Sequence, residues 1–139
     1  MKHSVFVSAC ILLMAAGAFA AESIGDLAWV GVWRGEFDGQ PSVTLTLAED
    51  SGELGGTVVL SMFGNDNGNV RIIASVPHVL LNLRLVGNRL TFEVKRSSAS
   101  NELLKFSVAL GSDGKAQFRC LNCGPAADAP LVELVKAQP

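Results

Sequence analysis

The sequence predicts an all-β protein, a single antiparallel up-and-down barrel of eight or nine strands. Apolar and polar residues alternate along short runs such as 42–48, 89–96 and 102–110. Because side chains alternate between the two faces of a strand, each run has one apolar and one polar face. Turn residues, mainly Gly, Asn and Asp, separate the runs. After residue 21, helical periodicity is limited to one short turn at 23–30. A two-sheet β-sandwich is the alternative architecture.

The first twenty residues have the pattern of a signal peptide. A short basic start at residues 2–3 precedes an apolar run from about 5 to 16, and Ala-Phe-Ala at 18–20 completes the small-x-small cleavage pattern. The apolar run is shorter than the roughly 20 residues that span a bilayer. We therefore predict cleavage near Ala20, export to the periplasm or out of the cell, and one β-barrel domain over residues 21–139, without a membrane span.

The expected strands follow one another as a meander. They are placed at 31–38, 42–48, 54–63, 70–76, 79–86, 89–96, 102–110 and 115–121, with a possible ninth at 131–136. The connections EDSG (49–52), GNDNGN (64–69), VGNR (86–89) and GSDG (111–114) contain residues that tolerate the positive φ angles of turns. GNDNGN is expected to be a longer polar loop. Pro77 cannot donate to a β-ladder and is expected between two strands. Barrel closure is favoured because it removes exposed strand edges.

The first strand contains a tryptophan between two glycines. Gly31-x-Trp33, about ten residues into the mature chain, resembles the start of lipocalin and wider calycin barrels. With the strand at 90–96, it resembles most closely the secreted bacterial lipocalin-like domains of uncharacterised function. The resemblance implies a tryptophan that closes one barrel end and an arginine from near the last strand packed across it. Arg119 is the candidate, although alternation with Phe118 directs it to the opposite face.

Cys120 and Cys123 are the two cysteines that follow the signal peptide. In an oxidising compartment such a pair usually forms a disulfide, which is the prediction here. A redox-active pair would need a helix N-terminus, whereas this pair follows a predicted strand; free thiols are the other alternative. Zinc would need two further ligands, and Asp66 is the single acid in GNDNGN, too few for calcium. No metal is predicted.

Residues that would support catalysis are sparse. His78 is the one histidine after the signal peptide, and no Gly-x-Ser-x-Gly elbow accompanies Ser61 or Ser75. Glu36 and Glu93 fall on outward faces beside basic residues, as expected of an ion-paired sheet surface. The net charge of −2 comes without any basic run that would favour nucleic acid. We therefore predict a non-enzymatic protein with no cofactor and no nucleic-acid partner.

Binding of a small apolar molecule inside the barrel is the predicted function. The candidate ligand-binding residues are Trp33, Phe37, Leu45, Leu60, Met62, Leu83, Phe92 and Phe106. Much the same apolar face also describes a filled core, since small barrels can close their interior with side chains. The alternative function is an accessory or protein-interaction domain without a ligand. It would be favoured by an exposed apolar patch, for which Val59, Phe63, Ile73 and Leu80 are the candidates.

Overall fold

The all-β prediction is confirmed. The computed structural model describes residues 24–124 and 131–139, so the predicted signal peptide at 1–20 lies outside the described residues. The elements are α1 (Ile24–Trp29), β1 (Gly31–Phe37), β2 (Gln40–Asp50), β3 (Glu53–Asp66), β4 (Asn69–Val79), β5 (Leu81–Val86), β6 (Arg89–Lys95), β7 (Leu103–Leu110), β8 (Ala116–Cys120) and β9 (Val132–Lys136). All nine expected strands form, with ends that differ from the expected ones by at most three residues.

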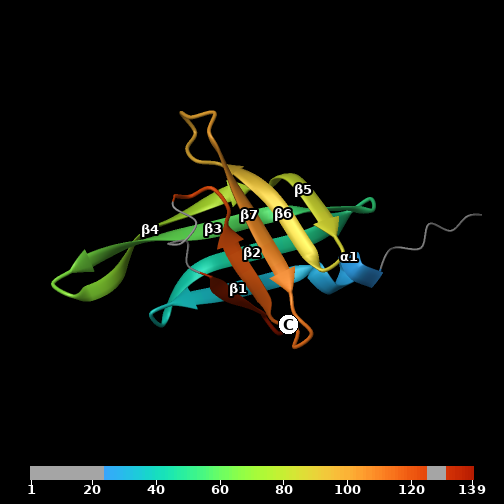
Figure 1. The fold of residues 1–139 in the computed structure, drawn as a ribbon, viewed down its shortest axis with the longest axis horizontal. Coiled ribbons are helices and arrows are strands. Elements are labelled where there is room, and N and C mark those ends of the chain that lie inside the picture. The colour runs from blue at the N-terminus through green and yellow to red at the C-terminus, as the bar shows by residue number, and fades with distance from the viewer. Residues whose placement is uncertain (1–23, 125–130) are drawn as a thin grey trace, which may run out of the picture.

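The strands form one antiparallel sheet curled into a half-barrel (Figure 1). Their order is β4-β3-β2-β1-β9-β8-β7-β6-β5. Strand β9 pairs with both β1 and β8 and so joins the two halves of the chain in one sheet. Strands β4 and β5 are its two edges, although they are consecutive in sequence. Leu80 lies between them, buried, and its backbone N–H donates to the carbonyl of Gly56 at 3.1 Å.

Two connections differ from expectation. The GNDNGN segment forms a two-residue hairpin turn at Asn67-Gly68, whose φ angles of 51° and 86° are those of a type I′ turn. Strands β3 and β4 therefore continue to this turn, and their hairpin extends beyond the rest of the sheet (Figure 1). Pro77, expected between strands, lies within β4 opposite Val59. An edge strand tolerates proline because one side of its backbone needs no ladder partner.

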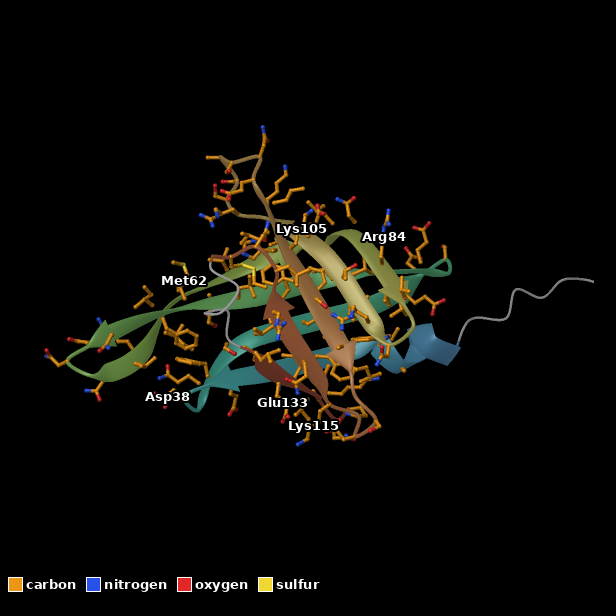
Figure 2. All side chains as sticks on the ribbon, viewed as in Figure 1. Asp38, Met62, Arg84, Lys105, Lys115 and Glu133 are labelled. Carbon is orange, nitrogen blue, oxygen red and sulfur yellow. A yellow bond between two sulfur atoms is a disulfide. The ribbon has the colours of Figure 1, made fainter. Side chains whose placement is uncertain are left out.

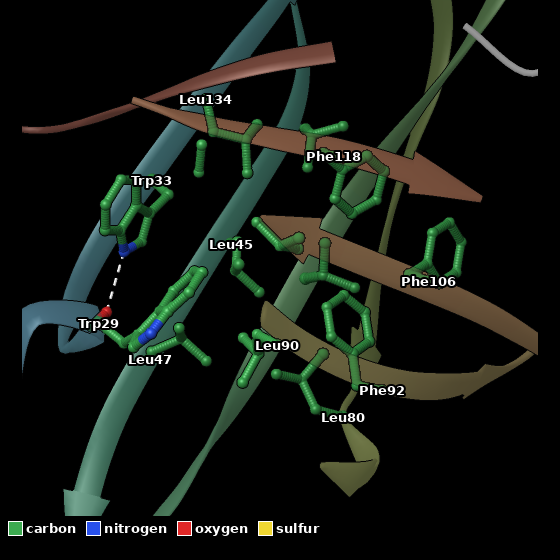
Figure 3. Close-up of a cluster of buried hydrophobic side chains, with 14 of the residues drawn as sticks. Trp29, Trp33, Leu45, Leu47, Leu80, Leu90, Phe92, Phe106, Phe118 and Leu134 are labelled. Carbon is green, nitrogen blue, oxygen red and sulfur yellow. Dashed lines mark hydrogen bonds between the residues drawn. The ribbon is translucent and has the colours of Figure 1, made fainter. Parts of the chain in front are cut away.

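Two tryptophans, Trp29 at the end of α1 and Trp33 in β1, fill one end of the half-barrel, which we call the closed end (Figure 3). Trp29 and Trp33 are each 1% exposed, and their ring centroids lie 5.7 Å apart. The indole Nε1–H of Trp33 donates to the Trp29 carbonyl at 2.9 Å, so its one polar group is paired. The cation over the Trp33 ring is Lys136 of β9, with Nζ 5.7 Å from the centroid. Arg119 is exposed on the outer face, as alternation predicts.

The glycines on either side of Trp33 make room for β9. At Gly31, where φ is 135°, an added Cβ would lie 2.8 Å from Cε of Lys136. At Gly35 it would lie 2.7 Å from Cδ2 of Leu134 and 3.0 Å from the backbone oxygen of Glu133. Real Cβ atoms do not approach other atoms so closely without displacement. The Gly-x-Trp-x-Gly pattern is thus explained by side chains of the neighbouring strand β9, which occupy the space beside both glycines.

The core continues from the tryptophans to a phenylalanine cluster. Phe106 stacks against both Phe92 and Phe118, with centroid distances of 5.5 and 5.0 Å, and the Phe92 and Phe118 centroids lie 6.4 Å apart. Leu45, Leu47, Leu90 and Leu134 lie between the two aromatic groups (Figure 3). The other buried aliphatic residues of the core are Val43, Val58, Leu80, Val94, Val108 and Ala116. Side chains therefore fill the half-barrel from its closed end to its middle.

Candidate ligand-binding site at the open end

A cavity of about 330 Å³ opens where the core ends. It is lined by residues of β1, β2, β3, β7 and β9 and by the segment after β8: Phe37, Ser42, Val43, Leu60, Ser61, Phe63, Leu104, Phe106, Cys123 and Val132. Phe37 ends β1, four residues beyond Trp33, which is about 13 Å along a strand. The cavity, which we call the mouth cavity, therefore lies toward the end of the half-barrel opposite the tryptophans. None of the described residues lining it is charged.

The rim of the mouth cavity is braced by contacts between two hairpins. The rings of Phe37 and Phe63 lie 5.2 Å apart and connect the end of β1 to β3. Gln40 also ties the β1–β2 hairpin to β4. Its Nε2 donates to the carbonyl of Val70 at 2.6 Å, and its Oε1 accepts from the backbone N–H of Ile72 at 3.1 Å. A carbonyl and an N–H two residues apart face the same side of a strand. Gln40 thus pairs with β4 much as a neighbouring strand would.

Ser42 is the one described residue with a buried, unpaired polar side-chain atom. It is 7% exposed, its side chain borders the mouth cavity, and its Oγ has no hydrogen-bond partner among the described residues. Its inward position follows from a β-bulge. Gly35 pairs with Val43 but Glu36 pairs with Pro41, so Ser42 is the extra residue of β2. A bulge bends its strand and re-aims a side chain, which places Ser42 and Val43 both inside.

The predicted disulfide is present between Cys120 and Cys123, whose Cα atoms are 5.7 Å apart. The intervening Asn122 fastens this turn to β7. Its Oδ1 accepts from the backbone N–H of Lys105 at 2.8 Å, and its Nδ2 donates to the carbonyl of Leu103 at 3.0 Å. Because Cys123 lines the mouth cavity, the disulfide and Asn122 together hold one wall of that cavity in place.

The structure places the predicted ligand-binding residues in three environments. Phe37, Leu60 and Phe106 line the mouth cavity. Trp33, Leu45 and Phe92 lie in the filled core, each 1% exposed or less, and Leu83 is half-buried and packs against that core. Met62 is 55% exposed and projects away from the interior (Figure 2). The register shifts between Met62 and Phe63, and Phe63 lines the cavity in its place.

Sequence reasoning did not identify Ser42 as a site residue. Strict alternation along β2 places Val43 and Leu45 inside and Ser42 outside, so the bulge reverses the expected orientation. One signal was present in Pro41. Within a central strand, proline is largely confined to the first residue or to a bulge. Cys123 was recognised as half of the disulfide, but its place in the cavity wall depends on the folding of β8 against β7.

The described residues define an all-β half-barrel, closed at one end and with an apolar cavity at the other. Within 24–124 and 131–139, no group of three or more His, Cys, Asp or Glu residues is placed to hold a metal ion. No helix in the described part of the chain has the length and apolar character to cross a membrane. Comparison with protein-family models, curated proteins and solved structures finds no match for this chain.

Proposed function

We propose that this chain is an exported, non-enzymatic binding protein that holds a small apolar molecule in the mouth cavity. The observation that carries this proposal is an apolar cavity of about 330 Å³ at the end of the half-barrel that the described core residues leave unfilled. Small-molecule sites range from about 300 to 1,000 Å³. Since a water molecule takes about 30 Å³ in the liquid, the enclosed part of such a ligand has about ten non-hydrogen atoms.

The chemistry of the walls supports an apolar ligand. Phe37, Leu60 and Phe63 offer carbon surface, which gains roughly 25 cal/mol for each Å² removed from water. Phe37 is 44% exposed, and a ligand in the cavity would cover part of that ring.

Binding rather than catalysis is supported by the polar groups at the cavity. The two lining hydroxyls belong to Ser42 and Ser61, and an activated serine nucleophile needs an adjacent base. The described lining residues include no His, Asp, Glu or Lys. Export is supported by the signal-peptide pattern at 1–20 and by the Cys120–Cys123 disulfide, since such bonds persist in oxidising compartments.

Native mass spectrometry of protein exported and purified without reduction tests the proposal. We expect either a small-molecule adduct that disappears on denaturation or, for bare protein, adduct formation with added naphthalene, which has ten non-hydrogen atoms. Leu60→Trp fills the mouth cavity and should abolish the adduct. Met62→Trp is the matched control, because this residue lies two positions away on β3 with an exposed side chain. Bare protein under both conditions, or an adduct that Leu60→Trp leaves unchanged, would contradict the proposal.

Protein–protein interaction is the second candidate function, and one observation favours it. The edge strand β4 exposes Ile73 by 57%, Val76 by 40% and Val79 by 66%. An apolar edge can accept an added strand from a partner. Of the residues expected in an exposed patch, Ile73 lies here, whereas Leu80 is buried. Sedimentation velocity over a range of protein concentrations tests this function. Self-association that Ile73→Lys removes would support it, and a monomer throughout would disfavour a self-pairing edge.

A further inference from the structure

We infer that the molecule bound in the mouth cavity is neutral and carries one hydrogen-bonding group, an alcohol or a carbonyl, which meets the hydroxyl of Ser42. This inference rests on the proposed function and specifies its ligand. It starts from Ser42, whose Oγ is buried without a partner among the described residues. Buried polar atoms in native proteins are nearly always paired with protein or water, so a ligand that displaces water from this cavity has to supply a polar atom to the Ser42 hydroxyl.

The position of Ser42 results from a specific feature of the backbone. Without the bulge opposite Gly35 and Glu36, alternation would direct the hydroxyl outward into water, where it could be solvated. The bulge instead directs it to the cavity, where no described protein group pairs with it. Bulges near functional sites often serve to re-aim a side chain. A binding role accounts for both the bulge and the unpaired hydroxyl.

Ser61 shows why a single hydrogen-bonding group is expected. It lines the same cavity, but its Oγ lies 3.1 Å from Oγ of Ser75 and is already paired. Ser42 therefore provides the free hydroxyl at the cavity. A serine hydroxyl can both donate and accept, so either an alcohol or a carbonyl satisfies it.

The cavity walls also indicate that the ligand is neutral. No described lining residue carries a charge. An ionised carboxylate or ammonium placed against Ser42 would lose its hydration without gaining an opposite charge, which is strongly unfavourable. A charged group could be accommodated only where it remains in water outside the rim. The expected ligand therefore has an apolar body and a single neutral polar group at the depth of Ser42.

Calorimetric titration with three matched probes tests this inference at neutral pH: naphthalene, naphthol and naphthoate. We expect the wild-type protein to bind naphthol about fivefold to tenfold more tightly than naphthalene, the effect of one hydrogen bond. Naphthoate should bind at least about tenfold more weakly than naphthol. Ser42→Ala should remove the preference for naphthol while keeping the affinity for naphthalene. Ser61→Ala, in which the paired hydroxyl is lost instead, should keep that preference.

The outcomes separate the inference from the proposed function. Three results would overturn the inference: equal affinities for naphthalene and naphthol, a preference for naphthol that persists in Ser42→Ala, or naphthoate binding as tight as that of naphthol. In each case, naphthalene binding would still support the proposed function. If none of the three probes binds, both are overturned. Thermal unfolding provides a second readout. Because the Ser42 hydroxyl makes no hydrogen bond to another described residue, free Ser42→Ala should be at least as stable as wild type.

Discussion

Replacing Trp33 by phenylalanine separates a structural role at the closed end from a role in ligand binding. The substitution removes the Nε1–H that donates to the Trp29 carbonyl at 2.9 Å, in a site where both tryptophans are 1% exposed. Leaving that carbonyl unpaired costs about 1–3 kcal/mol, and the void left by the smaller ring costs about 1 kcal/mol more. We therefore expect the free energy of unfolding to fall by about 2–4 kcal/mol, equivalent to a Tm lower by roughly 8–16 °C in a domain of this size.

Thermal and urea unfolding, monitored by circular dichroism, measure this loss of stability. Calorimetry with naphthalene, at a temperature below the unfolding transition, measures binding. Trp29→Phe is the matched control, since it shortens a ring at the same end but keeps the backbone carbonyl hydrogen-bonded to Trp33. Its expected loss is about 1 kcal/mol. Both variants should bind naphthalene with wild-type affinity, because Trp33 does not line the mouth cavity and Phe37, its lining residue on β1, lies about 13 Å further along the strand. Weakened binding by Trp33→Phe with unchanged stability would refute this assignment and place the ligand on Trp33.

Three further predictions concern the rest of the fold and the cavity rim. Gly35→Ala should destabilise the protein by about 1–3 kcal/mol, because its Cβ would meet Leu134; an unchanged Tm would argue against close packing of β9 over β1. Gln40→Ala should lose two hydrogen bonds to β4, which lowers the free energy of unfolding by about 1–2 kcal/mol, and amide hydrogen exchange at Ile72 should become faster. Replacing both Cys120 and Cys123 by serine should lower the free energy of unfolding by about 2 kcal/mol, as expected for so short a loop, and should weaken naphthalene binding. An unchanged affinity for naphthalene would show that the disulfide does not shape the cavity.

Alternation and turn chemistry were sufficient to predict the strands. Along β6, for example, Leu90, Phe92 and Val94 point inward and are buried, as the sequence pattern predicts. The pairing of β9 with both β1 and β8 could not be read from the sequence. It depends on contacts across the whole chain, and Gly31 and Gly35 are explained only once β9 is known to pack over them.

The candidate site was predicted only in part, because two bulges change the direction of side chains. The bulge in β2 turns Ser42 inward, and the register shift in β3 exposes Met62 and directs Phe63 to the cavity. Alternation assumes an unbroken period of two, so a single extra residue puts the side chains on one side of the bulge out of phase with those on the other. Trp33 was also a candidate ligand-binding residue, but it lies in the filled core. Its role at the closed end becomes evident only from its hydrogen bond to Trp29.

A methyl-resolved NMR titration of the exported protein with naphthalene tests most directly whether the mouth cavity is a binding site. We predict saturable shifts for the methyl groups of Leu60, Leu104 and Val132, which line the cavity. The methyl groups of Leu47, which lies opposite Gly31 at the closed end, should not shift. Shifts centred on Leu47, or on the exposed Ile73 of β4, or no saturable shifts at all would contradict the account.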